Sequence, residues 1–287
     1  MRHRRGFTLV EIMVALVIML IVTGAIYKLL HTTQRVSRAQ AEHATLQANV
    51  RAGSLVVPNE LRELNTVVGG SVGQNDILAM NASSITYRAM RGFGLVCQAP
   101  TATQIRIARS SFSGYRDPAV PRDSVYVFID GDETLGAVDS WIPVQITAIN
   151  PGSTCGANAA IALTVANTPA LTAVPVGTPV RTYEVMQLQL YVADGRSWLG
   201  ARSVSGNEAA IQPVLGPLTD GNGFQLEYFT AAGAATADVR QVNSVRVTIR
   251  GVSDRSVNTG SGGGSGPLGR IYETLQTRVS LRNSFRP

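Results

Sequence analysis

Apolar side chains run almost without interruption from Phe7 to Tyr27, directly after a short basic stretch, Met1–Gly6. As an α-helix this run would be about 31 Å long, which is the thickness of the hydrocarbon core of a bilayer. Its one charged side chain is Glu11. The pattern therefore predicts a membrane-spanning helix over residues 7–30, with a single carboxylate near its start.

Beyond His31 the apolar positions become periodic. They recur at spacings of three, four or seven, at Val36, Ala39, His43, Leu46, Val50, Val57, Leu61 and Leu64. This spacing predicts an amphipathic continuation of the helix over 31–66, with one side packed on a globular domain. Gly53 and Pro58 should interrupt it, and we expect a kink or a restart at Pro58 because proline has no N–H. The place of His43 on the apolar side favours a packed histidine over a metal ligand.

From residue 67 onward the sequence consists of short apolar or alternating runs separated by turn residues such as Asp194-Gly195 and Asp220-Gly221. The runs fall at 83–89, 103–110, 124–129, 143–149, 160–166, 183–193, 223–229, 243–251 and 274–283. Because strand follows strand with little helix between, we expect a mainly antiparallel β-domain over 67–287. The predicted fold class is α+β, with the long N-terminal helix packed on that domain. A Gly/Ser-rich stretch, 259–269, is predicted to be a flexible loop between the last two strands.

Composition changes this picture little. The chain is 45% hydrophobic and 15% charged, with a net charge of +6. Three of its cations, Arg2, Arg4 and Arg5, lie in the basic stretch at the start. The remaining excess of positive charge is mild and does not by itself indicate a nucleic-acid partner.

The two cysteines, Cys97 and Cys155, lie in neither a CxxC motif nor a cluster with the spacing of metal ligands. If the domain is exported, one disulfide between them is favoured over two buried free thiols.

Three interpretations of the N-terminus compete. A secretory signal could be cleaved after a small residue such as Ala25, but a carboxylate near the front of its apolar region is atypical. A plain signal anchor explains the span and leaves the acid unexplained. In either case the basic flank predicts that the N-terminus stays in the cytoplasm.

The third interpretation explains both the span and the acid. The stretch Gly6-Phe7-Thr8-Leu9-Val10-Glu11 resembles the processing site of type IV prepilins and type II secretion pseudopilins. In that family a membrane aspartyl peptidase cuts after the glycine and methylates the new N-terminal amine. The resemblance implies a leader over 1–6, cleavage between Gly6 and Phe7, N-methylation of Phe7, and a role for Glu11 in assembly. A carboxylate at bilayer depth needs a partner, and the amine of a neighbour's Phe7 could be that partner.

The C-terminal half narrows the resemblance. Residues 197–200, 213–233, 242–251 and 275–284 resemble the ends of large J-type pseudopilins and of their PilW-like pilus counterparts. Those proteins are minor subunits. The resemblance implies a structural subunit of a filament-tip or assembly-priming complex, in type IV pilus biogenesis or in type II secretion. It implies as partners the prepilin peptidase, other minor pilins or pseudopilins and the major pilin. It also implies a single pass through the inner membrane with a periplasmic domain, and the filament tip as a further location.

Candidate catalytic chemistry is sparse. All three histidines lie in the basic stretch or the long helix, so the β-domain has none for a Ser-His-Asp or Cys-His arrangement. Asp130, Asp132 and Glu133 could gather around Ca²⁺, but Asp and Gly after an apolar strand favour a hairpin turn. We therefore expect no enzyme activity, no cofactor and no metal.

One alternative function remains, a membrane-anchored binding module for DNA or a surface ligand. It is suggested by Arg106, Arg109, Arg116 and Arg122, which lie in one region with Tyr115 among them. Contacts to phosphates would make DNA binding steeply dependent on salt. Solvated strand faces and loops are the favoured explanation of these arginines, and nucleic acid is not an expected partner.

Overall fold

The computed structural model describes residues 8–66, 75–130, 140–258 and 268–281. Gly6, Phe7, Asp132, Glu133 and most of the predicted Gly/Ser loop lie outside these ranges. The chain divides into two compact units, which are considered separately below. One contains residues 1–48 and 252–273, and the other contains residues 49–251 and 274–287.

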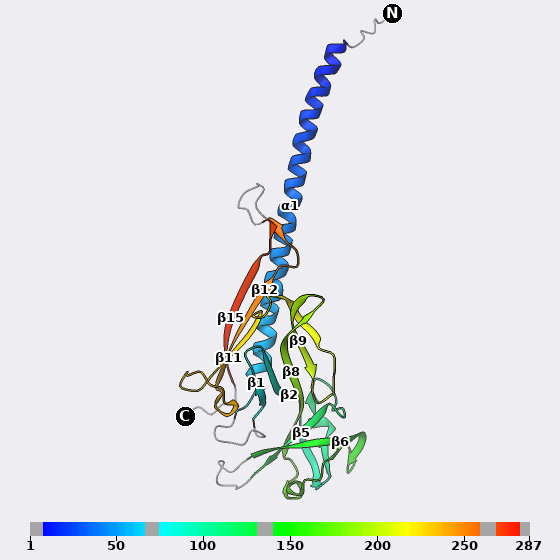
Figure 1. The fold of residues 1–287 in the computed structure, drawn as a ribbon. Coiled ribbons are helices and arrows are strands. Elements are labelled where there is room, and N and C mark those ends of the chain that lie inside the picture. Colours follow the sequence, from blue (N-terminus) through cyan, green and yellow to red (C-terminus); the bar gives the residue numbers. More distant parts are fainter. Residues whose placement is uncertain (1–7, 67–74, 131–139, 259–267, 282–287) are drawn as a thin grey trace, which may run out of the picture. The chain divides into compact units, whose positions relative to one another are not determined.

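A single helix, α1 (Leu9–Arg62), accounts for nearly all of the first described range (Figure 1). It continues through Gly53 and Pro58, so the predicted restart at Pro58 is wrong. A proline inside a helix loses one backbone hydrogen bond. Its neighbours Val57 and Leu61 are fully buried, and this burial stabilises the last turn in spite of that loss.

The buried side of α1 is the predicted one over its C-terminal part. Leu46, Val50, Val57, Leu61 and Leu64 are all buried, as the spacing indicated. Towards the N-terminus the same periodicity does not lead to burial.

Val36 is 45% exposed and His43 is also exposed, so the prediction of a packed histidine at position 43 is wrong. Periodicity identifies a side of a helix, but it does not tell which residues on that side become buried.

Gly53 has a packing role rather than a helix-breaking one. An added Cβ would lie 2.4 Å from Cδ2 of Leu215 and 2.9 Å from Cδ1 of Ile249. The missing side chain thus lets the helix backbone approach strands of the sheet closely. Glycine in a helix interior lowers stability by roughly 1 kcal/mol relative to alanine, and this close approach gives a reason for its presence.

The remainder is β-structure in antiparallel pairs, which confirms the α+β class. The strands are β1 (Ile77–Met80), β2 (Ser84–Thr101), β3 (Gln104–Ala108), β4 (Ser113–Gly114), β5 (Asp123–Ile129), β6 (Ser140–Cys155), β7 (Asn158–Val165), β8 (Pro179–Ala193), β9 (Arg196–Ser203), β10 (Gln212–Leu218), β11 (Phe224–Phe229), β12 (Ser244–Val252), β13 (Val257–Asn258), β14 (Leu268–Gly269) and β15 (Tyr272–Ser280).

Each strand-like run of the sequence overlaps one of these strands. The sequence pattern did not reveal β1, β9 or β10. Of these, β10 contains Pro213, Gly216 and Pro217, residues that argue against a strand on propensity alone.

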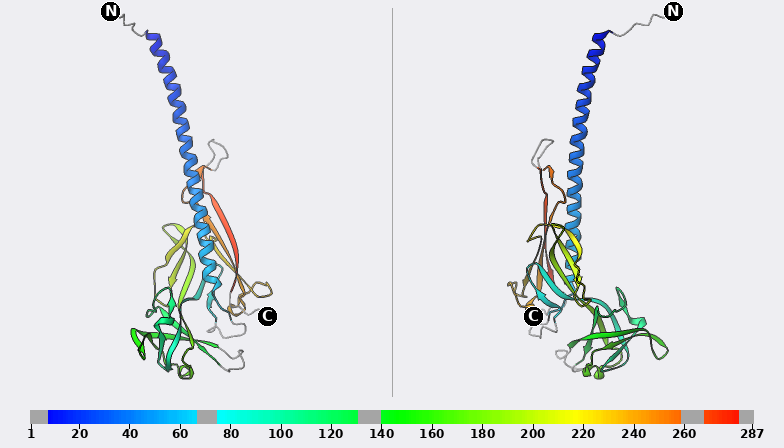
Figure 2. Two further views of the ribbon diagram at one scale, coloured as in Figure 1. Left: turned by 180° about the vertical axis from the view of Figure 1, so that it is seen from behind. Right: turned by 45° about the vertical axis from the view of Figure 1, so that its right-hand side comes forward.

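Part of the sheet closes on itself. The long strand β2 pairs with β3 near its end and with β8 along its first part. The path from β3 through β7, β6 and β5 returns to β8, so these strands form a closed antiparallel ring. In both views of Figure 2 the cyan and green strands of this ring gather together, apart from the yellow strands further along the chain.

The interior of the ring is an apolar core. Its fully buried members include Ile105, Ile107, Val127, Ile161 and Leu163. Along β3 the buried residues alternate with half-buried ones, whereas residues 160–163 of β7 are all buried. The strands outside the ring, β9, β10, β12 and β11, continue the sheet from β8, and β15 pairs with β12.

Two predicted turns can be checked. Asp194 and Gly195 join β8 to β9 as a two-residue hairpin, and both have positive φ (51° and 70°). That conformation is the one for which Asp-Gly is favoured in tight hairpins. Asp220 and Gly221 lie in the turn between β10 and β11. The Gly/Ser stretch does not join β12 and β15 directly, because its flanks pair with each other as β13 and β14.

Substitution of Gly53 tests the close approach. We expect Gly53→Val to lower the free energy of unfolding by about 1–3 kcal/mol, because it overpacks the contact with Leu215 and Ile249. Ala52→Val is the matched control, since Ala52 is exposed on the same helical turn and should change stability by less than about 0.7 kcal/mol. Chemical denaturation of the full chain in detergent measures both, and equal effects of the two variants would contradict the contact.

Candidate functional site

The side chains of Thr8 and Glu11 cap the N-terminus of α1 reciprocally. The hydroxyl of Thr8 accepts a hydrogen bond from the backbone N–H of Glu11 (3.3 Å). In return, Oε2 of Glu11 accepts hydrogen bonds from the backbone N–H (3.0 Å) and the hydroxyl (3.1 Å) of Thr8. This arrangement is a capping box, in which two orphan donors of a helix start are satisfied by each other's residue.

The capping box adds a second role to Glu11 that the sequence analysis missed. The signal was present, because Thr8-Leu9-Val10-Glu11 has the Thr-x-x-Glu spacing of the motif. An intramolecular cap already gives the carboxylate hydrogen-bond partners before any neighbour is present. Cleavage between Gly6 and Phe7 and methylation of Phe7 concern residues outside the described ranges, and they stay predictions.

The first half of α1 is long and apolar enough to cross a membrane. None of the side chains in its apolar window is buried. Leu9, Val17, Ile21 and Leu29 are each more than half exposed. Within the described part of the chain nothing covers this surface, which fits a single-pass membrane anchor.

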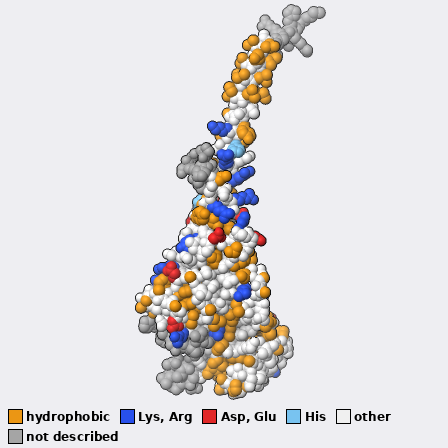
Figure 3. Space-filling view, viewed as in Figure 1, with side chains coloured by type: hydrophobic (Ala, Val, Ile, Leu, Met, Phe, Trp, Pro, Cys, Tyr) orange, Lys and Arg blue, Asp and Glu red, His pale blue; other side chains and the backbone are white. Residues whose placement is uncertain are grey.

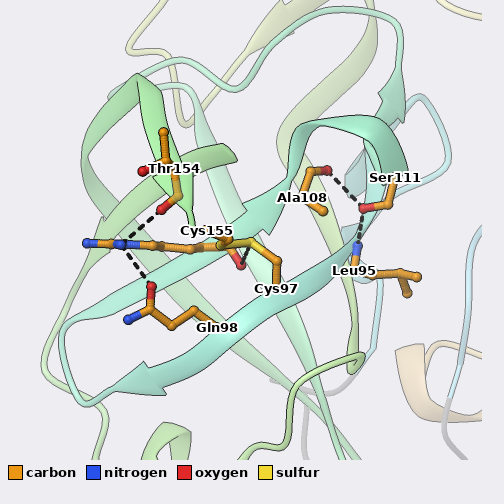
Figure 4. Close-up of a disulfide and its surroundings, with 8 residues drawn as sticks. Leu95, Cys97, Gln98, Ala108, Ser111, Thr154 and Cys155 are labelled. Carbon is orange, nitrogen blue, oxygen red and sulfur yellow. Dashed lines mark hydrogen bonds between the residues drawn. A yellow bond between two sulfur atoms is a disulfide. The ribbon is translucent and has the colours of Figure 1, made fainter. Parts of the chain in front are cut away.

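A disulfide joins Cys97 of β2 to Cys155 at the end of β6, with Cα atoms 6.0 Å apart (Figure 4). These two strands are not neighbours, because β3 and β7 lie between them in the ring. The bond therefore ties two sides of the ring together. Next to it, Nη1 of Arg106 donates to Oε1 of Gln98 (2.8 Å) and to the backbone carbonyl of Thr154 (3.0 Å).

The arginines that suggested DNA binding all have partners within the protein. Arg106 is bonded as described above, and Arg109 forms an ion pair with Asp117 (2.7 Å). Arg116 is bound to Asp123 and Glu184, while Arg122 is bound to Glu184 and Glu208. Three of the four, Arg109, Arg116 and Arg122, are paired with carboxylates, which favours a structural role over phosphate binding.

Glu184 is the centre of this ionic cluster. Its side chain is only 5% exposed and receives Nε of Arg91 (3.0 Å), Nη2 of Arg116 (3.2 Å) and Nε of Arg122 (3.2 Å). Burial raises the pKa of Glu184, but hydrogen bonds from Ser203 and Arg91 and the guanidinium charges lower it further, so the net pKa is below its ordinary value. The cluster holds the segment between β3 and β5 against β8.

A second buried acid, Asp76, has a pKa above its ordinary value. Burial raises the pKa of Asp76 from 3.8 to about 6, in spite of hydrogen bonds from the Asn65 N–H (2.7 Å) and the Tyr126 hydroxyl (3.2 Å). Arg88 donates to the same hydroxyl (2.6 Å) and its charge lowers the pKa, but not enough to offset burial. Sequence patterns do not reveal this buried acid, because its burial arises from packing between distant segments.

A groove of about 660 Å³ is lined by residues of β2, β4 and β8, together with Tyr115 and with Glu63, which follows α1. Arg91, Arg181 and Glu63 contribute charge, and Phe93 and the exposed Tyr115 contribute aromatic surface. The guanidinium of Arg181 lies 4.6 Å from the ring centre of Trp141. The size of the groove suits a small ligand, but its charges of both signs do not indicate a particular one.

The calcium candidate cannot be assembled from the described residues. Asp130 is exposed at the end of β5, and Asp132 and Glu133 lie outside the described ranges. Among residues 8–66, 75–130, 140–258 and 268–281, no group of three His, Cys, Asp or Glu side chains could hold a metal ion.

An exposed apolar N-terminal helix on an antiparallel β-domain, with a capped acid in its first turn, defines a membrane-anchored α+β protein. Residues 1–27 match the family model of the prokaryotic N-terminal methylation motif. This motif is the signature of type IV prepilins and pseudopilins, and it supports a type IV pilin-like or pseudopilin-like protein. No curated protein and no solved structure matches the chain.

Removing the disulfide should lower stability substantially. We expect the double variant Cys97→Ser, Cys155→Ser to lose about 4 kcal/mol of unfolding free energy, because the bond closes a loop of 58 residues. Denaturation of the full chain in detergent, followed by tryptophan fluorescence, measures the loss. The unsubstituted protein under reducing conditions is the control and should show the same shift. An unchanged denaturation midpoint in both samples would contradict a stabilising bond.

Asp76 predicts an unusual dependence on pH. Between pH 3.8 and about 6 its carboxyl is protonated in the folded state and ionised in the unfolded one, so its contribution to stability falls as pH rises. We expect the unsubstituted chain to lose about 2.4 kcal/mol relative to Asp76→Asn between pH 4 and pH 7. The comparison removes the effect of the other acids, which titrate in both proteins. Parallel stability profiles would show that Asp76 is ionised normally in the fold.

Proposed function

We propose that the chain is a minor structural subunit of a type IV pilus or type II secretion filament system. The observation that carries the proposal is the methylation motif followed directly by α1, whose exposed apolar half holds a single acid, Glu11. The prepilin peptidase cuts between Gly6 and Phe7 and methylates Phe7. The β-domain then lies in the periplasm, and the processed chain joins other minor subunits in a complex at the filament tip or at the start of assembly.

The structure offers no comparable support for the alternative of a DNA-binding module. The arginines that suggested it are engaged in internal ion pairs and hydrogen bonds, and phosphate binding would have to compete with these carboxylates. The groove beside Tyr115 favours a small surface ligand. A structural role also agrees with the lack of a histidine in the β-domain, which removes the commonest general base.

The proposed role of Glu11 in assembly follows from the cost of placing a charge in an apolar environment. In a filament the acid lies in an apolar surrounding, where an ionised carboxylate needs a charged or hydrogen-bonding partner. The amine created at Phe7 of a neighbouring subunit provides one. A paired charge of this kind fixes the axial register between helices, the best-attested use of a buried ion pair.

Intact-mass measurement of the chain purified from its native membrane tests the processing step. We expect a polypeptide that lacks Met1–Gly6 and carries one methyl group on Phe7. A chain that retains the leader, or that is cut beyond the apolar helix, would refute the proposal. Variants of Glu11 then distinguish its role as a helix cap from the role of its charge.

Glu11→Gln keeps an acceptor for the cap but loses the charge, while Glu11→Ala loses both. We expect both variants to reduce recovery in crosslinked complexes with other methylation-motif subunits by at least tenfold, because an uncompensated amine remains in the membrane. Thr8→Ser, which keeps the capping hydroxyl, is the control and should assemble normally. Normal assembly of Glu11→Gln would mean that the acid acts only as a helix cap.

A further inference from the structure

The charges on α1 between residues 12 and 50 all lie along one side of the helix. They are Lys28, Arg35, Arg38 and Glu42, and His31 falls on the same side. Successive members are three or four residues apart, so at 3.6 residues per turn they occupy an arc of about 80° around the helix axis. We call Lys28, His31, Arg35 and Arg38 the cationic stripe.

The cationic stripe faces solvent. Its four side chains are all exposed, and Figure 3 shows Lys and Arg side chains in blue on α1 beyond its apolar end. None of Lys28, Arg35 and Arg38 has an ion pair or a side-chain hydrogen bond with another residue in the described ranges. The same ranges contain the β-domain arginines, such as Arg116 and Arg122, that are matched with carboxylates. An acid that pairs with the stripe would therefore have to come from outside the described residues.

A second copy of this chain is a poor source of those acids. Two copies packed in parallel and in register bring each cation against its own counterpart, and like charges repel. An axial shift of about 10.5 Å, seven residues, places Glu42 opposite Arg35 but leaves Arg35 of one copy beside Lys28 of the other. A shift of four residues places Glu42 opposite Arg38, and a shift of fourteen residues places it opposite Lys28. Each of these shifts creates a single attractive pair.

Lipid headgroups could pair with only part of the cationic stripe. If the apolar part of α1 spans the bilayer, Lys28 lies at its surface and Arg38 lies about 15 Å further out. The headgroup layer on each side is only about 5–8 Å thick. Phosphates can therefore meet Lys28, but Arg35 and Arg38 lie largely beyond them. A helix that runs beside α1 can meet all three cations.

We propose that the cationic stripe is the docking face for the N-terminal helix of a different subunit that carries acidic side chains at the matching spacing. The inference rests on the proposed function, because it requires α1 to pack beside other subunits. It deepens that function by stating which neighbour is accepted. Repulsion along the stripe excludes a second copy from this position, and the chain is present once in each such contact.

A charge-swapped copy of the chain serves as the probe. It carries Lys28→Glu, Arg35→Glu and Arg38→Glu, and it bears a different tag from the unchanged chain. Both copies carry Gln34→Cys as a crosslinking site beside the stripe. Since Cys97 and Cys155 are joined to each other, the introduced thiol is the only free one. The two copies are expressed together, membranes are treated with a thiol crosslinker, and the products are sorted by tag.

We expect mixed pairs to crosslink about tenfold more than pairs of the unchanged chain or pairs of the swapped chain, because each of three surface ion pairs contributes about a factor of two. The difference should shrink as salt is raised, since exposed charges are screened. A neutral control with Lys28→Gln, Arg35→Gln and Arg38→Gln should pair with the unchanged chain at an intermediate level.

Equal crosslinking of like and mixed pairs would overturn the proposal. So would crosslinking that follows the lipid instead of the partner, which is read in vesicles of phosphatidylglycerol and of phosphatidylcholine. Intact masses of the same samples report leader removal independently. A processed chain with no charge preference refutes the docking face alone, whereas an unprocessed chain refutes the proposed function.

Discussion

The structure depends on an apolar helix that has no protein around it. From Leu9 to Leu30 the side chains of α1 are exposed, and the described β-domain supplies no cover for them. Each exposed aliphatic side chain costs roughly 1.5–3 kcal/mol in water relative to a buried one. The first part of α1 is therefore stable only in lipid or among other helices. That constraint supports the proposed role, in which the surface that anchors the chain also packs against other subunits.

Periodicity predicted the long helix and many of the strands, and it was a poor guide to their limits. The alternation at 103–110 and 160–166 placed β3 and β7 because both strands have one face in a closed core. It could not show that the ring closes, since closure depends on β2 pairing with β8, nearly a hundred residues away. Likewise the spacing of Leu46 and Val50 identified the packed side of α1, while the exposure of His43 depends on how far the domain extends.

In the candidate site, too, local features could be predicted from the sequence and long-range contacts could not. Glu11 could be found from the sequence because its spacing from Gly6 and Phe7 is local, and Thr8 could have been found by the same reasoning. Asp76 and Glu184 could not, since their burial and their partners arise from chain segments that meet only in the fold. The arginines at 106–122 illustrate the limit most clearly. Composition grouped them as a cationic region, whereas the fold pairs Arg109, Arg116 and Arg122 with carboxylates and gives Arg106 neutral hydrogen-bond partners.

The exposed cations of α1 also have an electrical consequence. In the proposed orientation Lys28, Arg35 and Arg38 end up outside a membrane whose interior is negative. At a potential of about 100 mV, moving each positive charge outward opposes the field by about 2.3 kcal/mol, or about 7 kcal/mol for the three. In that orientation the outward transfer of these three charges is an electrically uphill step, which partitioning of the apolar helix has to offset.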